Sequence, residues 1–404
     1  MIPFSPPRID EKTVEAVKET LLSGWITTGP KTKLFEQKIS EYCGLKNTLC
    51  LNSATAGLEI MLRWFGVREG DEVILPSYTY SATANVIIHT GAKPIFVDVN
   101  DSDFNININK IKEKITDKTK VIMPVDIGGL PVDYYAIMEL VQSSAIKSFF
   151  TANTSEQEKL GRIMVLSDSA HSFGAKYHKK NIGQQADAHV FSFHAVKNLT
   201  TAEGGAITLN FPNPFDNNEI YKYLCIITLH GQSKDALAKT KPGAWRYDII
   251  EPGYKCNMMD IQAAIGLVEL ERYENDTLVR RKHICERYNY SFKDKPWAKI
   301  PKFLLSNKES SYHLYMLRIN NCSEDQRDLI IQKIADKSVA VNVHFIPLPM
   351  LTAYKKLGYK IEDYPVTYNN YSCEISLPVF YNLTESQVEE VITIVIESVE
   401  AVIC

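Results

Sequence analysis

The sequence of 404 residues has no pair of cysteines in C-x-x-C spacing, although it contains eight cysteines. Scattered thiols argue against a zinc site and against a disulfide framework, and they suit a reducing compartment. No apolar run reaches membrane-spanning length, and the opening MIPFSPPRIDEK lacks the layout of a signal peptide. The net charge of -3 gives no electrostatic case for nucleic acid or an acidic membrane surface. We therefore expect a cytoplasmic protein without a bound metal.

A glycine-rich dinucleotide fingerprint is also absent. The first expected strand, NTLCLN, is followed by SATAGLE, whereas a Rossmann unit needs G-x-G-x-x-G and an acidic residue further on. An NAD-dependent sugar-nucleotide dehydrogenase or epimerase is therefore disfavoured, although an alternation of strands and helices would suit it.

That alternation is clear through the first two thirds of the chain. A first helix is expected between Asp10 as its cap and Gly24 as its stop, with Val14, Leu21 and Leu22 on its apolar stripe. The expected strands that follow are NTLCLN, DEVILPS, KPIFVDV, KVIMPVD, RIMVLSD and AHVFSFH. Short apolar strands between helices predict an α/β fold with a mostly parallel sheet covered on both faces.

We expect the chain to divide near residue 275. A large α/β domain would span residues 1–274, and a smaller α+β domain would span residues 275–404. The smaller domain has expected strands at YHLYMLRIN and VAVNVHF and a final amphipathic helix. The polar, turn-rich residues 143–161 interrupt the alternation, and we interpret them as a surface insertion.

A single lysine, Lys197, stands in FSFHAVKNLTTAEGGA, after an expected strand and before a glycine pair. A lysine is usually solvated, but one held in a partly apolar pocket loses its proton and attacks a carbonyl. The best-known partner of such a lysine is pyridoxal phosphate (PLP). That cofactor also requires an anion site for its phosphate, an acid beside its pyridine nitrogen and a flat side chain against its ring.

The phosphate requirement has candidates at a junction between a strand and a helix. Ala54 and Thr55 lie there, where free backbone amides and the helix dipole favour an anion. Ser192, five residues before Lys197, could add a hydroxyl donor. An ordinary helix cap is the alternative interpretation of the junction.

The ring requirements have candidates after two other strands. Asp168 directly follows RIMVLS, where open α/β sheets bind ligands, and its carboxylate could keep the pyridine nitrogen protonated. His171 could hydrogen-bond the ring hydroxyl or cover the ring. Tyr80, just past DEVILPS, could stack on it. Taken alone, Asp168 is also a common turn former and Tyr80 a common core residue.

The order of the motifs resembles the DegT/DnrJ/EryC1/StrS family of PLP-dependent sugar aminotransferases, nearly from end to end. The motifs are GWITTGPKTKLFE, NSATAGLEIML, DEVILPSYTYSATANVI, GAKPIFVDV, SDSAHSFGA, FSFHAVKNLTTAEGGA, GYKCNMMDIQAAIG and SLPVFYNLT. The resemblance implies a fold type I transferase, like aspartate aminotransferase, that works as a homodimer with each active site at the subunit interface.

The resemblance also implies roles for individual residues. Lys197 matches the lysine that binds the cofactor covalently. Asn257 matches a residue that reaches the phosphate of the cofactor in the neighbouring subunit. Thr28, His344 and His230 fall where family members contact substrate. The family often has HYxPLH around the residue matched by His344, and this chain has HFIPLPM instead, which bears on the substrate and not on the cofactor. The other matches are Asp168 to the pyridine nitrogen, Tyr80 to the ring face, His171 to the ring hydroxyl, and Ala54, Thr55 and Ser192 to the phosphate.

The implied reaction is a ping-pong transamination with glutamate as amino donor, which leaves as 2-oxoglutarate. The implied acceptor is a nucleotide-linked keto sugar, a UDP- or dTDP-4-keto-6-deoxy sugar. The motif versions most resemble members that aminate C-4, for lipopolysaccharide, O-antigen, capsule or glycan assembly. Amination at C-3 stays open, and so does a non-catalytic regulatory protein that retains the fold.

Overall fold

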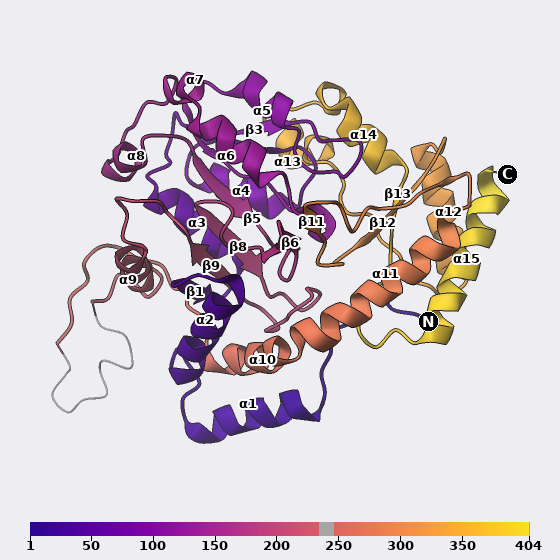
Figure 1. Ribbon diagram of the computed structural model, residues 1–404, viewed down its shortest axis with the longest axis horizontal. Coiled ribbons are helices and arrows are strands. Elements are labelled where there is room, and N and C mark those ends of the chain that lie inside the picture. Colours follow the sequence, from indigo (N-terminus) through magenta and orange to yellow (C-terminus); the bar gives the residue numbers. More distant parts are fainter. Residues whose placement is uncertain (234–245, 404) are drawn as a thin grey trace.

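The computed structural model describes residues 1–233 and 246–403 (Figure 1). A seven-stranded sheet lies at its centre, in the order β1-β9-β8-β5-β4-β2-β3. Its strands are β1 (Thr48–Leu51), β2 (Glu72–Pro76), β3 (Lys93–Val97), β4 (Thr119–Ile122), β5 (Met164–Asp168), β8 (Ala188–Ser192) and β9 (Gly205–Leu209). Strands β2, β3, β4, β5 and β8 run parallel, and β9 is antiparallel to both of its neighbours. The predicted α/β fold with a mostly parallel sheet is confirmed.

Both faces of the sheet are covered, because alternate residues of each strand enter different hydrophobic cores. In β5, Val165 packs in one core with α2 (Pro30–Cys43) and α6 (Tyr134–Gln142). Its neighbours Met164 and Leu166 pack in the other core, with α3 (Ala54–Trp64), α4 (Ser81–His89) and α9 (Asn217–Ile227). Because successive residues point to opposite faces and both faces are covered, most positions of these strands are apolar, and the strands appear in the sequence as continuous apolar runs. The parallel strands therefore end together at one edge of the sheet.

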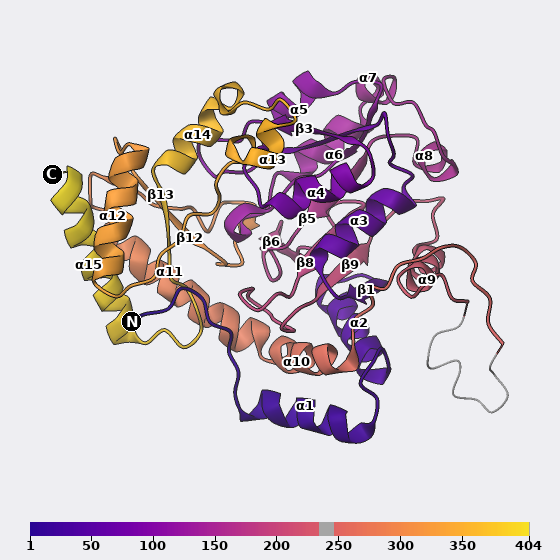
Figure 2. The same cartoon turned by 180° about the vertical axis from the view of Figure 1, so that it is seen from behind.

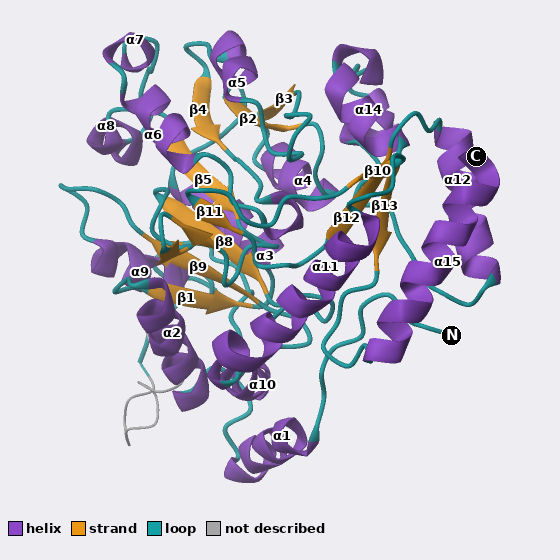
Figure 3. Cartoon of the chain, turned by 45° about the vertical axis from the view of Figure 1, so that its right-hand side comes forward, coloured by secondary structure: helices purple, strands orange, loops and turns teal. Residues whose placement is uncertain are grey.

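The last third of the chain builds a second, antiparallel sheet. Its order is β10-β12-β13, and Figure 3 shows it beside α11, α12 and α15. A π-helical turn, Tyr273–Thr277, joins α10 (Asp260–Glu271) to α11. We keep a domain boundary near residue 275 as a proposal. The bounds here are α11 Leu278–Phe292, β10 Ala298–Lys299, β12 Tyr315–Ile319, α12 Glu324–Asp336, α13 Thr352–Lys355, α14 Pro365–Ser372, β13 Glu374–Leu377 and α15 Glu385–Ile403.

The predicted strand VAVNVHF is not a regular strand. Val339 and Asn342 each form only an isolated bridge, to Ile2 and to Ser376 respectively. Ile2 reaches Val339 because the first residues of the chain run along this part of the molecule, and both chain ends lie on the α15 side (Figure 2).

Residues 143–161 contain two short helices, α7 (Ser144–Lys147) and α8 (Ser155–Leu160). The side chain of Gln157 is buried and donates a hydrogen bond to the backbone oxygen of Phe65 at 2.9 Å. The segment is therefore anchored to the end of α3. The remaining short elements are α5 (Ile108–Lys114) and a small sheet of β6 (Lys176–Tyr177), β7 (Lys180–Asn181) and β11 (Lys308–Glu309).

The first helix, α1 (Glu11–Ser23), has the predicted ends. The Asp10 side chain accepts a hydrogen bond from the Thr13 amide, and Gly24 adopts a left-handed conformation with φ 78°. Its apolar stripe, however, is not part of a core. Leu21 and Leu22 are exposed by 54% and 79%, because Thr13 and Thr20 form the buried side of the helix.

None of the helices in the described residues is long and apolar enough to cross a membrane.

Candidate active site

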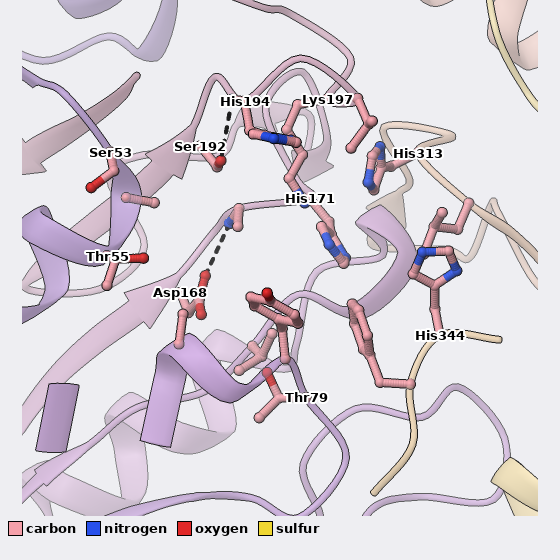
Figure 4. Close-up of a pocket in the computed structure, with 18 of the residues that line it drawn as sticks. Ser53, Thr55, Thr79, Asp168, His171, Ser192, His194, Lys197, His313 and His344 are labelled. Carbon is pink, nitrogen blue, oxygen red and sulfur yellow. Dashed lines mark hydrogen bonds between the residues drawn. The ribbon is translucent and has the colours of Figure 1, made fainter. Parts of the chain in front are cut away.

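A cavity of about 370 Å³ opens where β2, β5 and β8 end (Figure 4). The structure brings eight of the predicted residues to its wall: Ala54, Thr55, Tyr80, Asp168, His171, Ser192, Lys197 and His344. They come from distant parts of the chain, and the parallel strands collect them because the carboxyl ends of such strands share one edge.

Lys197 lies in the loop that joins β8 to β9, and its backbone amide donates to the His194 carbonyl oxygen at 2.9 Å. Burial lowers the pKa of Lys197 from 10.5 to about 8, although the Asp168 carboxylate opposes that shift. A sizeable fraction of the amine is therefore neutral near physiological pH. A neutral amine is the form that attacks a carbonyl.

Asp168 ends β5 and is buried. One carboxylate oxygen accepts a hydrogen bond from the Thr83 hydroxyl at 2.7 Å, and the other accepts from the Ala170 amide at 3.2 Å. Burial raises the pKa of Asp168, whereas these two donors and the Lys197 ammonium lower it. The side chain is thus a fixed acceptor that faces the cavity from the side opposite Lys197 (Figure 4).

His171 is held as a neutral imidazole with a defined tautomer. Its Nδ1 accepts a hydrogen bond from the Gly128 amide at 3.3 Å, so the ring hydrogen resides on Nε2. Burial lowers the pKa of His171 well below 6.5, and the nearby Lys197 and His344 add to that effect. His171 therefore offers one N–H donor at neutral pH.

The anion end of the cavity lies at the start of α3. Ser53 caps this helix, since its hydroxyl accepts from the Ala56 amide at 3.1 Å. The Ala54 and Thr55 amides belong to the first turn, where no intrahelical acceptor exists. One residue of the glycine pair has a steric reason to be glycine, because a Cβ at Gly205 would lie 2.5 Å from the Ala54 nitrogen. The missing side chain leaves this amide open to an anion.

The residues therefore fit PLP, which the predicted family implies. A half-buried lysine with a lowered pKa faces a fixed carboxylate. A helix start kept open by a glycine offers free amides, and the Ser192 hydroxyl at the end of β8 lies on the same cavity wall. Tyr80 also lines the wall, with its ring 5.8 Å from that of Phe345.

Three predicted residues, all within the described part of the chain, do not line this cavity. Asn257 donates from its side-chain amide to the Thr28 hydroxyl at 2.5 Å, and Thr28 donates to the Met258 carbonyl oxygen at 2.5 Å. His230 follows α9, and its backbone amide donates to the Tyr254 carbonyl oxygen at 2.7 Å. Thr28, Asn257 and His230 therefore lie outside this wall, although Asn257 bridges to Leu51 shortly before Ala54, and their roles stay predictions.

The sequence reasoning missed several residues at the wall. His313 is the most prominent: its ring centroid lies 4.4 Å from that of His171, and its Nδ1 lies 2.8 Å from the Asn198 side-chain oxygen. Phe4 and Phe345 also line the cavity. His313 opens the predicted strand YHLYMLRIN, and a histidine at a strand end was the only signal available.

Known proteins resemble this chain along its whole length. The family model of the DegT/DnrJ/EryC1/StrS aminotransferase family matches residues 7–396. "Spore coat polysaccharide biosynthesis protein SpsC" from Bacillus subtilis is 36% identical over 395 residues, which is 97% of this chain and 95% of that protein.

Solved structures agree with the sequence matches. "Putative sugar aminotransferase Spr1654" from Streptococcus pneumoniae, in its PMP-form, is 46% identical with a TM-score of 0.96, and the match covers 100% of both chains. The same protein was also solved in a PLP-form. Helicobacter pylori PseC, an aminotransferase involved in the biosynthesis of pseudoaminic acid, is 28% identical with a TM-score of 0.85 over 99% of both chains. The predicted fold type I architecture, enzyme class and PLP cofactor are confirmed.

Proposed function

Since the chain belongs to the DegT/DnrJ/EryC1/StrS aminotransferase family, we propose that it transfers an amino group from glutamate to a nucleotide-linked keto sugar. The acceptor would be a UDP- or dTDP-4-keto-6-deoxy sugar, aminated at C-4, with C-3 as the alternative position. The product would enter lipopolysaccharide, capsule or glycan assembly. Support comes from relatives described as a sugar aminotransferase and as a protein of polysaccharide biosynthesis.

The observation that carries this proposal is the placement of Lys197 and Asp168 in one cavity. PLP, when bound, supplies an electron sink that stabilises the carbanion formed at the α-carbon of an amine. Asp168, fixed by Thr83 and the Ala170 amide, is placed to hold a proton on the pyridine nitrogen. His171 is placed to donate its Nε2 hydrogen to the ring hydroxyl.

Lys197 would then move the proton. Because its pKa is lowered to about 8, the Lys197 amine is a competent base near physiological pH and takes the proton from the α-carbon of the donor. The resulting Lys197 ammonium would deliver that proton to the exocyclic carbon of the cofactor in the same half-reaction, and the second half-reaction would run the transfer in reverse, ending at the acceptor carbon. The walls formed by Phe345, Val125 and Leu314 limit the access of water to this transfer.

We further propose that the enzyme is a homodimer in which Asn257 completes the partner's phosphate site. The support is indirect. Asn257 and Thr28 lie outside the cavity of their own chain, and the apolar residues Leu21, Leu22, Ile26 and Met259 are exposed by 43% or more. An apolar surface of this kind on α1 and beside Asn257 is suited to a second copy of the chain.

The decisive experiment incubates the PLP-loaded protein with glutamate and a panel of UDP- and dTDP-linked keto sugars. We expect glutamate to bleach the yellow colour, one keto sugar to restore it, and NMR of the product to place the new amine at C-4 or at C-3. Borohydride should fix the cofactor on Lys197. A colour that does not bleach would favour a regulatory protein, and a cofactor trapped on another lysine would refute the site.

A further inference from the structure

His344 is held rigidly at the cavity wall by four contacts. Its backbone amide donates to the Glu374 carboxylate at 3.0 Å, and its carbonyl oxygen accepts from the Tyr78 hydroxyl at 2.7 Å. The Phe4 ring stacks on the imidazole, with the ring centroids 5.4 Å apart. The fourth contact joins Nδ1 of His344 to the Ser376 hydroxyl at 3.0 Å. The ring thus has one nitrogen engaged behind the wall.

Glu374 and Ser376 form a buried relay behind this ring. They lie two residues apart on β13, so their side chains project from the same face of the strand. Both are fully buried, and their side chains are joined by a hydrogen bond of 2.5 Å between the Ser376 hydroxyl and Oε1 of Glu374. The relay therefore runs from Glu374 through Ser376 to Nδ1 of His344.

The single hydrogen of the Ser376 hydroxyl gives this relay two states. When Glu374 is ionised, Ser376 donates to the carboxylate, so Nδ1 of His344 must donate to Ser376 and Nε2 carries no hydrogen. When Glu374 is protonated, the carboxyl group donates to Ser376, Ser376 donates to Nδ1, and Nε2 carries the hydrogen. His344 is neutral in both states, which differ by one proton.

We propose that Glu374 is a positioning residue for the substrate site: through Ser376 it sets whether His344 presents a hydrogen-bond donor or an acceptor. This inference rests on the proposed function, since it assigns His344 to substrate recognition. A proton that arrives on Nε2 releases the Nδ1 hydrogen to Ser376, and Ser376 passes its own hydrogen to Glu374. The proton is thereby stored on the buried carboxyl group.

The surroundings of Glu374 decide which state prevails. Burial raises the pKa of Glu374 to about 8, against the hydrogen bonds from Ser376 and the His344 amide. The groups that face Glu374 are Ser376, the His344 amide, Arg318, Arg327, Tyr78 and Cys373. Burial, and then Lys197, lowers the pKa of His344 itself to about 4, so the ring stays neutral.

Near neutral pH, Glu374 is therefore protonated and His344 presents its Nε2 hydrogen to the cavity. A donor at this place selects an oxygen acceptor on the substrate, such as a keto or a diphosphate oxygen. Above the Glu374 pKa the same nitrogen becomes an acceptor and no longer suits that oxygen.

The test is the ¹⁵N NMR spectrum of the PLP-loaded protein labelled on histidine, with the His344 signal assigned from His344→Gln. At pH values about two units below and above the Glu374 pKa, we expect the hydrogen to move from Nε2 to Nδ1, nearly completely on each side. Glu374→Gln should lock the hydrogen on Nε2 at both pH values, because its carbonyl oxygen accepts from the His344 amide, as Oε2 of Glu374 does, and its NH2 group then faces Ser376 and donates to it. Ser376→Ala removes the link between Glu374 and His344, so the His344 tautomer should be the same at both pH values.

Glu385→Gln is the matched control, since Glu385 begins α15, is exposed and pairs with the exposed His283 instead of with a relay residue, so it should leave the His344 signal unchanged. The unaltered protein showing the same tautomer at both pH values would overturn the proposal, and so would a switch that persists in Glu374→Gln. Neither result requires a keto sugar, so this test fails or succeeds separately from the proposed function. In turnover assays, Glu374→Gln should also remove the Glu374 contribution to the pH dependence of kcat/KM for the acceptor around pH 8, while the contribution of Lys197 near the same pH remains.

Discussion

At the scale of single residues, the lowered pKa of Lys197 has a measurable consequence. In cofactor-free protein, the rate of colour formation with added PLP should rise about tenfold from pH 7 to pH 9 and then level off, because the neutral fraction of an amine with a pKa of about 8 rises in that range. Stopped-flow absorbance measures the rate.

Free Nα-acetyl-lysine is the control for this measurement. Its amine has an ordinary pKa, so its rate should continue to rise up to about pH 10. A protein profile that follows the free amino acid would contradict the assignment of Lys197 as a half-buried, partly neutral amine.

The sequence located Lys197 and Asp168 because each follows an apolar strand, and strand ends in a parallel sheet meet at one edge. It could not locate His313 or Glu374 in the site. His313 lies two residues before β12, and its distance from His171 depends on how the antiparallel sheet packs against the large one. Glu374 lies in β13 and meets His344, thirty residues earlier, only because the segment before it bridges to that strand. No local pattern carries that information.

At the scale of elements, the close approach of β9 to the start of α3 depends on Gly205. Gly205→Ala places a methyl group 2.5 Å from the Ala54 nitrogen, so β9 and α3 must separate or the amide must turn away. We expect PLP to dissociate about tenfold to a hundredfold more readily, which corresponds to the usual cost of overpacking. Fluorescence titration of cofactor-free protein with PLP measures the change.

Gly70→Ala is a suitable control for that variant. A Cβ at Gly70 meets no atom within 4 Å, but the residue has a left-handed φ of 91°, so the change strains the turn before β2 without touching the cavity or the proposed interface. It should lower stability while PLP affinity stays the same. Equal loss of PLP affinity in both variants would show that Gly205 acts only through general stability.

The elements themselves were largely predictable. Apolar runs predicted the parallel strands and the caps predicted α1, but β9 was not among the predicted strands, since it begins at the second glycine of the pair that follows Lys197. Its antiparallel direction has no sequence pattern either, because a strand reads the same in either direction. The exposure of the α1 stripe was not visible either. A spacing of 3.6 residues predicts a helix with one apolar side, but it does not indicate which part of the molecule, if any, covers that side.

At the scale of the whole molecule, that exposed stripe yields a prediction about assembly. Leu22→Glu should convert the proposed dimer to monomers and abolish transamination at the same time, because a charge in an apolar interface is costly and, under that proposal, Asn257 would no longer reach a second cavity. Sedimentation velocity and a glutamate bleaching assay measure the two effects on the same sample.

Leu329→Glu serves as the control, because Leu329 is also an exposed leucine, at 49%, but lies on α12. It should remain dimeric and active. An active monomer of Leu22→Glu would contradict shared active sites. A Leu22→Glu protein that remains a dimer would show that the interface lies elsewhere.

The first five residues of the chain contribute to the wall of the cavity as well as to the packing of the molecule. Ile2 pairs with Val339, Phe4 lies on His344, and the Ser5 hydroxyl lies 3.4 Å from the Val196 carbonyl oxygen, beside Lys197. Removing these residues in a shortened expression clone would delete part of the cavity wall, which includes Phe4 and Ser5. We expect such a clone to fold but to admit more water to the cavity, a defect that would not be visible at Lys197 itself.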